Sequence, residues 1–141
     1  MTSVEHSRIP NFNYEILIID DEPIMLQASE LVLMMGGYNV RTIDNGTDAV
    51  NIVLSNPEKY KIILLDLMMK DISGYDVLKE LQDIIAKNNI FVIVYSGLEL
   101  DHKVEEAKAL GAKAFLIKSQ SNDILLDIIN NFVTLLNQDS N

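Results

Sequence analysis

Four apolar runs of four or five residues give this chain its most constraining pattern, because each run ends at a polar side chain. They precede Asp20-Asp21, Asp66, Ser96 and Lys118. Apolar and polar residues do not alternate within the runs, which is typical of parallel strands covered on both faces. In open α/β sheets, ligands bind outside the carboxyl ends of the strands. The pattern therefore predicts that these polar residues surround one crevice.

The segments between the runs have helical spacing. In the first, apolar residues recur at steps of four, three and four: Ile24, Ala28, Leu31 and Met35. Further helices are expected at 47–55 and 122–137, after Gly74 where apolar residues recur from 77 to 85, and before Gly111 where they recur from 104 to 110. A weaker strand is expected at 38–43. Strict alternation of strands and helices predicts a parallel sheet with helices on both faces, because each right-handed crossover needs a helix to return the chain.

One domain is predicted, spanning residues 14–137. Residues 1–13 are mostly polar and are broken by Pro10, so we expect a flexible leader. Residues 138–141 form a short polar end. With 141 residues the chain is long enough to bury a core without disulfides or a structural metal.

The composition narrows the class of protein. The chain has 11 Lys and Arg against 21 Asp and Glu, and its net charge of −10 disfavours binding to nucleic acid or to an anionic membrane surface. The absence of cysteine excludes disulfides and thiolate metal sites. No apolar run approaches the roughly 20 residues of a membrane-spanning helix, and no signal peptide is recognised. We expect a cytoplasmic protein.

Asp66 is the acid that is hardest to explain by folding alone. It follows the apolar run 62–65 directly and precedes Leu67, and an isolated buried carboxylate is costly. It either caps the strand end or serves as a carboxylate nucleophile of the type that forms an aspartyl phosphate. Asp20 and Asp21 have a similar pair of explanations, as caps of a helix N-terminus or as metal ligands.

A divalent cation is expected on electrostatic grounds. Three carboxylates and one ammonium leave two negative charges in excess, which a dication would cancel. Like charges about 4 Å apart repel by roughly 4 kcal/mol per pair at an effective dielectric near 20. Only oxygen ligands are offered, and neither His nor Cys is near in sequence. Mg²⁺ or Mn²⁺ therefore fits, and Zn²⁺ does not.

Together these residues resemble the motifs of the response-regulator receiver domain of two-component signalling. The motifs are "IIDDEP" at Asp20-Asp21, "LLDLMMKDISGYDVL" at Asp66, "VIVYSG" at Ser96 and "GAKAFLIKS" at Lys118. The successive intervals from Asp21 onward are 45, 30 and 22 residues, which is typical of that family. The resemblance implies a flavodoxin-like (βα)5 fold, doubly wound, with a five-stranded parallel sheet in the order 2-1-3-4-5.

The resemblance also implies the chemistry. Asp66 would accept a phosphoryl group from a phosphohistidine of a histidine kinase or histidine phosphotransfer protein. Mg²⁺ would be bound by Asp20, Asp21, Asp66 and the backbone carbonyl of Met68. The chain would carry out only its own phosphorylation and dephosphorylation, so it is not expected to be an enzyme in the usual sense.

The remaining residues would read out the phosphorylated state. Lys118 and Ser96 would contact the phosphoryl group, and Phe115 would turn inward as Ser96 moves. The downstream target is an unknown protein, reached by a receiver that stands alone or belongs to a longer regulator. The last predicted helix has more apolar residues than one face requires, which indicates extra burial, or a homodimer or partner surface in the region of the fourth and fifth helices.

Two positions depart from the family pattern. Lys70 stands where many members have proline, so the loop after Asp66 is either looser or uses Lys70 as a charged contact. Ser119 replaces a proline that commonly follows the lysine with a cis bond. The Lys118-Ser119 bond is expected to be trans, because a cis bond without proline costs about 3 kcal/mol.

Two other classes of protein fit less well. A phosphohydrolase resembling the haloacid dehalogenases needs a second acid two residues after the nucleophile, where this chain has Met68. A flavodoxin-like cofactor binder needs a loop that cradles phosphate after the first strand. There the acidic run Asp20-Asp21-Glu22 would repel a phosphate unless a metal intervened.

Overall fold

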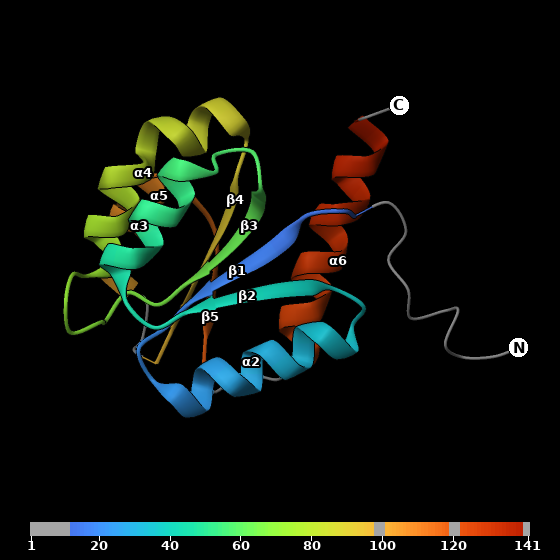
Figure 1. Cartoon of the computed structure of the whole chain (residues 1–141), viewed down its shortest axis with the longest axis horizontal. Helices are drawn as coiled ribbons and strands as arrows, with labels where there is room; N and C mark the ends of the chain where they lie inside the picture. Colours follow the sequence, from blue (N-terminus) through green and yellow to red (C-terminus); the bar gives the residue numbers. More distant parts are fainter. Residues whose placement is uncertain (1–11, 98–100, 119–121, 140–141) are drawn as a thin grey trace, which may run out of the picture.

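The five predicted strands form one parallel sheet. The computed structural model describes residues 12–97, 101–118 and 122–139. The strands are β1 (Glu15–Ile19), β2 (Asn39–Ile43), β3 (Tyr60–Leu65), β4 (Phe91–Ser96) and β5 (Ala112–Ile117). They lie in the order β2-β1-β3-β4-β5, and all neighbours pair in parallel (Figure 1). The predicted flavodoxin-like fold and its strand order are confirmed.

Helices cover both faces of the sheet. They are α2 (Pro23–Met35), α3 (Gly46–Ser55), α4 (Gly74–Asn88), α5 (Asp101–Ala109) and α6 (Asn122–Asp139). Helices α3, α4 and α5 pack on one face, and α2 and α6 pack on the other (Figure 1). Helix α6 continues two residues beyond the predicted end at position 137. Among the described residues, no helix is both long enough and apolar enough to cross a membrane.

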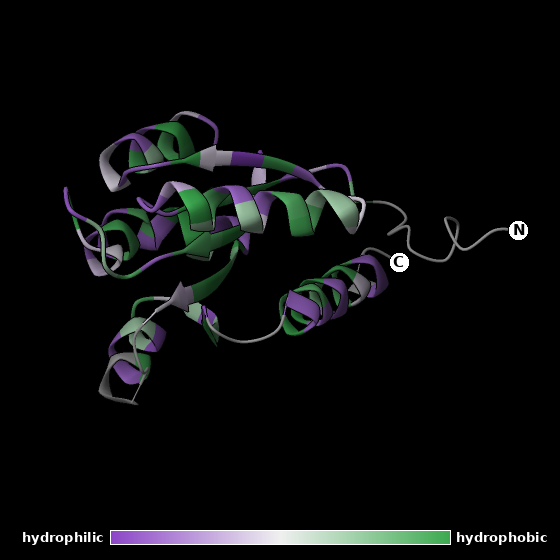
Figure 2. Cartoon of the chain, turned by 90° about the horizontal axis from the view of Figure 1, so that it is seen from below, coloured by the Kyte–Doolittle hydropathy of each residue, from purple (hydrophilic) through white to green (hydrophobic). Residues whose placement is uncertain are grey.

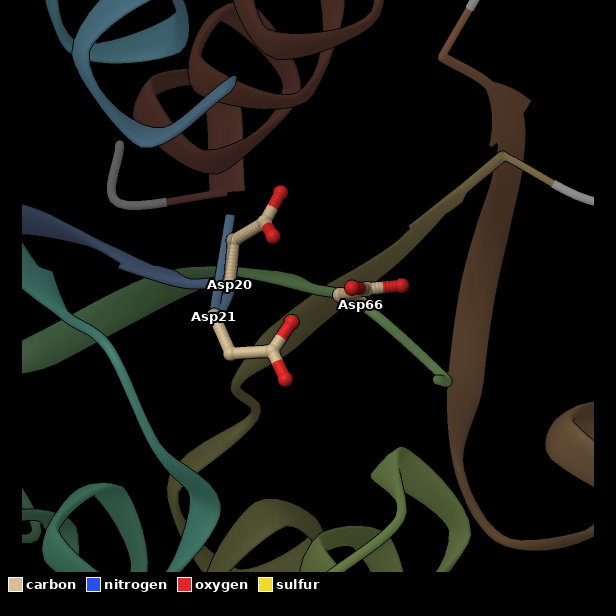
Figure 3. Close-up of side chains that lie close together, drawn as sticks. All are labelled: Asp20, Asp21 and Asp66. Carbon is tan, nitrogen blue, oxygen red and sulfur yellow. The ribbon is translucent and has the colours of Figure 1, made fainter. Parts of the chain in front are cut away.

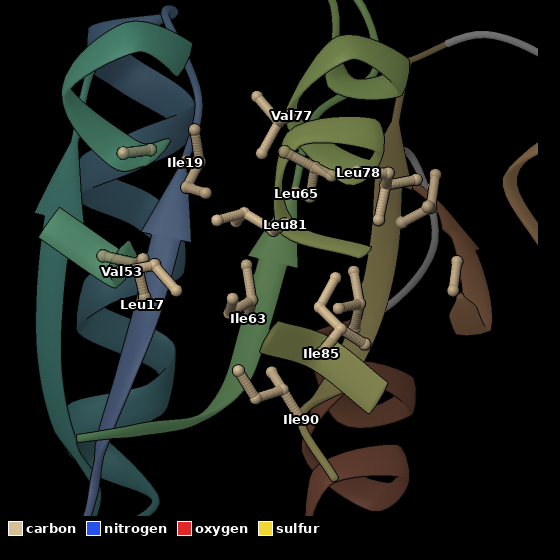
Figure 4. Packing of buried hydrophobic residues seen from close by; sticks show 14 of the residues in the cluster. Leu17, Ile19, Val53, Ile63, Leu65, Val77, Leu78, Leu81, Ile85 and Ile90 are labelled. Carbon is tan, nitrogen blue, oxygen red and sulfur yellow. The ribbon is translucent and has the colours of Figure 1, made fainter. Parts of the chain in front are cut away.

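Two cores lie on opposite sides of the sheet, because successive residues of a strand point to opposite faces. In β1, Leu17 and Ile19 join the core beneath α3, α4 and α5 (Figure 4), while Ile16 and Ile18 join the core beneath α2 and α6. The strands β3 and β4 divide their residues in the same way. Burial on both faces explains why the runs are apolar without alternation.

Helix α2 is confirmed, but the regular apolar stripe that predicts it faces solvent. Ile24, Leu31 and Met35 are 80%, 59% and 74% exposed, whereas Ser29 and Leu33 are buried. Helix α2 is the helix nearest the viewer in Figure 2. Most positions of this helix are apolar, so the spacing alone does not select the side that packs on the sheet.

The end of the predicted leader packs on the domain. The ring of Phe12 lies 5.5 Å from that of Tyr14 and 5.7 Å from that of Tyr38, and it contacts the core beneath α2 and α6. The rest of the predicted leader, residues 1–11, lies outside the described residues, as do Ser119 and the Lys118-Ser119 bond.

Asp71, in the loop between β3 and α4, closes the N-terminus of α3. Its carboxylate accepts hydrogen bonds from Gly46 N–H (3.1 Å), Thr47 N–H (2.9 Å) and the Thr47 hydroxyl (2.9 Å). Asn45 accepts the next N–H, that of Asp48. A helix start leaves such donors unpaired. Partial desolvation raises the pKa of Asp71, but the hydrogen bonds from Thr47 and Gly46 outweigh it and hold the pKa below its usual range.

Gly74 brings the start of α4 against the backbone that carries Asp66. Its N–H donates to the carbonyl of Leu67 at 2.9 Å. A Cβ atom at Gly74 would lie 2.5 Å from the carbonyl oxygen of Asp66 and 2.7 Å from the Cα of Leu67. The close approach therefore depends on the absence of a side chain.

We expect Gly74→Ala to lower the free energy of unfolding by about 1–3 kcal/mol, because the new methyl group meets main-chain atoms that cannot rotate away. Chemical denaturation measures the change. Gly97→Ala is the matched control, because a Cβ atom there meets nothing within 4 Å. Equal losses in the two variants would contradict the expectation.

We expect Asp71→Ala to lower the free energy of unfolding by about 1 kcal/mol at pH 7, the usual effect of losing a helix cap. Since the folded-state pKa of Asp71 is depressed, its contribution is present above the unfolded-state pKa of roughly 4 and is lost as the pH falls below it. Denaturation of wild type and variant from pH 7 to pH 3 should show the difference shrinking. The control is Asp83→Ala, at an exposed position of α4. A difference that stays constant with pH would contradict the assignment.

Candidate functional site

Asp20 and Asp66 directly follow the neighbouring strands β1 and β3. The N–H of Asp66 donates to Ile19 O at 3.0 Å, and that of Asp20 donates to Ile43 O at 3.1 Å. The strand pairing thus continues through both aspartates. Asp20 and Asp66 are only 2% and 3% exposed, respectively. The sheet itself therefore holds two buried carboxylates side by side.

Asp21 completes an acidic cluster. One carboxylate oxygen from each of Asp20, Asp21 and Asp66 lies within 4.8 Å of the others. Figure 3 shows that Asp20 and Asp21 come from the end of β1 and Asp66 from the end of β3. Three carboxylate oxygens are hard ligands of the kind that Mg²⁺ and Mn²⁺ prefer. The donor set therefore fits the predicted cation, and the predicted convergence of these acids is observed.

Lys118 reaches this cluster from the end of β5. Its Nζ lies 2.7 Å from Asp20 Oδ2, 2.7 Å from Glu22 Oε1 and 3.3 Å from Asp66 Oδ2. The lysine side chain is 7% exposed. Burial lowers the pKa of Lys118, but the hydrogen bonds to Asp20 and Glu22 and the charges of Asp20 and Asp66 outweigh it and raise the pKa above its usual range. The ammonium is therefore charged at neutral pH.

Glu22 is a partner of Lys118 that the sequence analysis names in the acidic run but does not assign to the site. It directly precedes Pro23, the first residue of α2, and its carboxylate pairs with Lys118. Its side chain is 61% exposed, so the pair forms at the edge of the site. The signal in the sequence is a third acid directly after the Asp20-Asp21 pair.

The carboxyl group of Asp66 is harder to ionise than that of a solvent-exposed aspartate. Burial raises its pKa, the N–H of Met68 and the ammonium of Lys118 lower it, and the charge of Asp20 raises it. The net result is a pKa of about 6. The environment therefore favours added positive charge next to Asp66.

Met68 contacts the Asp66 carboxylate through its backbone amide group. Met68 N–H donates to Asp66 Oδ1 at 3.2 Å, and the residue is 52% exposed. That the backbone carbonyl of Met68 binds the metal stays a prediction.

Ser96 and Phe115 lie on β4 and β5. Leu65 is paired with Val94, so Asp66 comes level with the end of β4, near Ser96. Ser96 is 1% exposed, and its carbonyl accepts the N–H of Lys118 at 2.8 Å. Phe115 is partly buried and packs on the core beneath α3, α4 and α5. Their switching roles stay predictions.

Lys70 contacts the acidic cluster through its main chain. Its N–H donates to Asp21 Oδ2 at 2.9 Å. The neighbouring Asp71 holds the start of α3. The loop is therefore held by hydrogen bonds at two successive residues. The bond from the Lys70 N–H cannot be predicted from the pattern of side chains, because it is made by the main chain.

A comparison with protein families matches the response regulator receiver domain to residues 16–130. The cell cycle transcriptional regulator CtrA of Caulobacter vibrioides is 38% identical over 112 residues, which cover 79% of this chain and 46% of that protein. The 3',5'-cyclic-nucleotide phosphodiesterase regA of Dictyostelium discoideum is 31% identical over 111 residues, covering 78% of this chain and 14% of that protein. The chain thus spans less than half the length of these relatives.

Solved structures agree. A response regulator receiver domain protein from Clostridium thermocellum superposes with a TM-score of 0.79 and 28% identity, covering 89% of this chain and 98% of that one. The receiver domain of the Francisella response regulator 1452 gives a TM-score of 0.72 and 28% identity, covering 86% and 96%. Fold, acidic edge and family match agree: the chain belongs to the response regulator receiver domain family of two-component signalling.

Proposed function

We propose that Asp66 accepts a phosphoryl group from a phosphohistidine of a histidine kinase or histidine phosphotransfer protein. The observation that carries the proposal is the buried Asp66 carboxylate, which lies between other acids and the ammonium of Lys118. One oxygen of Asp66 would attack phosphorus while the phosphorus–nitrogen bond breaks. The electron pair of that bond would stay with the departing imidazole.

Asp20, Asp21, Asp66 and the Met68 carbonyl would hold Mg²⁺ or Mn²⁺. When bound, the cation supplies positive charge that offsets the charge of the transferring group. The protein residues position the acceptor: the β1 and β3 ends fix Asp20 and Asp66, and Met68 N–H orients Oδ1 of Asp66. Positioning and electrostatics supply most of the catalysis in such transfers.

On phosphorylation, Lys118 would give up its ion pair with the Glu22 carboxylate and bind the phosphoryl group instead. It now pairs with Glu22, whose exposed side chain can turn away into solvent at little cost. Asp20 stays beside Lys118 because the strand end fixes it. The ammonium would then bind a phosphoryl oxygen, and the new pair would replace the one with Glu22.

Two hydrogen bonds would drive the switch. Ser96 and Lys118 would each bond a phosphoryl oxygen, and charge-assisted bonds contribute roughly 1.5–3 kcal/mol each. Moving a two-state equilibrium from 1:99 to 99:1 takes about 5.5 kcal/mol, so the two bonds approach what is needed. We infer that Phe115 turns inward as Ser96 moves, which would change the surface around α5, β5 and α6.

The output is proposed to pass through protein contact in the cytoplasm. We place the receiver unit at residues 14–137 and expect neither nucleic acid nor membrane to bind within it, in keeping with the net charge of −10. On α6, Ile124 and Leu135 are 39% and 58% exposed. Apolar residues at such positions support a homodimer or a downstream protein in the region of α5 and α6.

Incubation with Mg²⁺ and a small phosphodonor such as acetyl phosphate tests the acceptor. We expect wild type to gain the mass of one phosphoryl group and Asp66→Asn to gain none, because an amide is not a nucleophile for phosphorus here. Intact-mass spectrometry measures the gain, and it should be abolished by a chelator. Asp83→Asn, an exposed acid of α4, is the control and should gain the group as wild type does. An equal gain in Asp66→Asn would overturn the assignment.

We expect Asp66→Asn to stabilise the cation-free protein above pH 6. The folded-state pKa of about 6 lies above the unfolded value of roughly 4, so wild type keeps the full stability of protonated Asp66 below pH 4 and loses it as the pH rises through 6. The variant should therefore be more stable than wild type at pH 8, and the difference should shrink as the pH falls toward 4. Denaturation in the presence of a chelator measures this. Equal stability of the two proteins at pH 8 would contradict the assignment.

A further inference from the structure

The loop between Asp66 and α4 is anchored to two different strand ends. Lys70 N–H donates to Asp21 Oδ2, at the junction of β1 and α2. Asp71 accepts hydrogen bonds from Gly46 and Thr47, at the start of α3. Since these two residues are adjacent in the chain, the contacts of Asp71 with α3 also restrict where the Lys70 amide can lie relative to the acidic cluster.

The contact at Lys70 belongs to the main chain. Every residue type except proline offers a backbone N–H at this position. The Lys70 side chain is exposed, and the described contact to Asp21 is made by the amide. The identity of the side chain therefore matters less for this bond than whether residue 70 is proline.

Asp21 depends on this donor more than its neighbours do. Asp20 accepts the N–H of Glu22 at 2.9 Å and pairs with Lys118. Asp66 accepts the N–H of Met68 and also pairs with Lys118. Within residues 12–97, 101–118 and 122–139, Lys70 N–H is the one hydrogen-bond donor to the Asp21 carboxylate.

Repulsion makes the donor important. Asp21 is half-buried beside two other carboxylates. Like charges at this range repel, and a rotation of the Asp21 side chain toward solvent would relieve the repulsion. A hydrogen bond to an ionised oxygen is charge-assisted and favours the orientation in which it forms.

We propose that the backbone N–H of Lys70 is a positioning group that keeps the Asp21 carboxylate turned toward Asp20 and Asp66 before a cation arrives. The carboxylates of Asp20, Asp21 and Asp66 would then already lie close together when a cation binds. The inference rests on the proposed function, in which Asp21 is a cation ligand. Loss of a hydrogen bond to a metal-ligating side chain typically weakens metal binding by about 10–100-fold.

Calorimetric titration of Mg²⁺ into wild type, Lys70→Ala and Lys70→Pro separates the amide from the side chain. Lys70→Ala keeps the N–H and should bind Mg²⁺ as wild type does. Lys70→Pro removes the N–H and should bind about 10-fold more weakly. Equal affinity of Lys70→Pro and Lys70→Ala would overturn the inference. A wild-type protein that does not bind Mg²⁺ would instead count against the proposed function.

Amide hydrogen exchange provides a second measurement that needs neither proline nor metal. We expect the Lys70 N–H to exchange faster in Asp21→Ala than in wild type, because its acceptor is gone. Glu80→Ala, an exposed acid of α4, should leave the rate unchanged. If Lys70→Pro does not fold, this comparison decides the matter, and an unchanged rate in Asp21→Ala would overturn the inference.

Discussion

The burial of two carboxylates at the edge of the sheet depends on their ion pairs with the ammonium of Lys118. Two buried carboxylates, those of Asp20 and Asp66, follow adjacent strands, and burying either one without a partner would be costly. Lys118 lies within 3.3 Å of both and is itself nearly fully buried. The ends of β1 and β3 can therefore hold acids in the interior because β5 brings a cation to them.

The strand order makes this contact geometrically simple. β1 and β3 are neighbours in the sheet although β2 lies between them in the chain, so Asp20 and Asp66 come together without any special loop. β5 is two strands away from β3, and adjacent strands lie about 4.8 Å apart. A long side chain is needed to span β4, which suits a lysine at position 118 better than a short polar residue.

The sequence predicts the strands and the acidic cluster, but it does not predict the contacts that depend on how separate elements meet. Continuous apolar runs indicate strands covered on both faces, and the residues that follow them indicate the acidic cluster. The buried side of α2 is not predicted, because most positions of that helix are apolar and more than one side could therefore pack on the sheet. The pair between Lys118 and Glu22 depends on how two elements meet, and the bond from Lys70 to Asp21 uses a group that nearly every residue carries.

The loop after Asp66 unites the chemistry of the site with the stability of the fold. Met68 N–H contacts the Asp66 carboxylate, Lys70 N–H contacts Asp21, and Asp71 caps α3. At its end Gly74 starts α4 against the Asp66 backbone. Since the same short segment makes all these contacts, a change of charge at Asp66 acts on a loop that cannot shift without disturbing the starts of two helices. We therefore expect the charge state of Asp66 to influence α3 and α4 as well as the β5 side of the sheet.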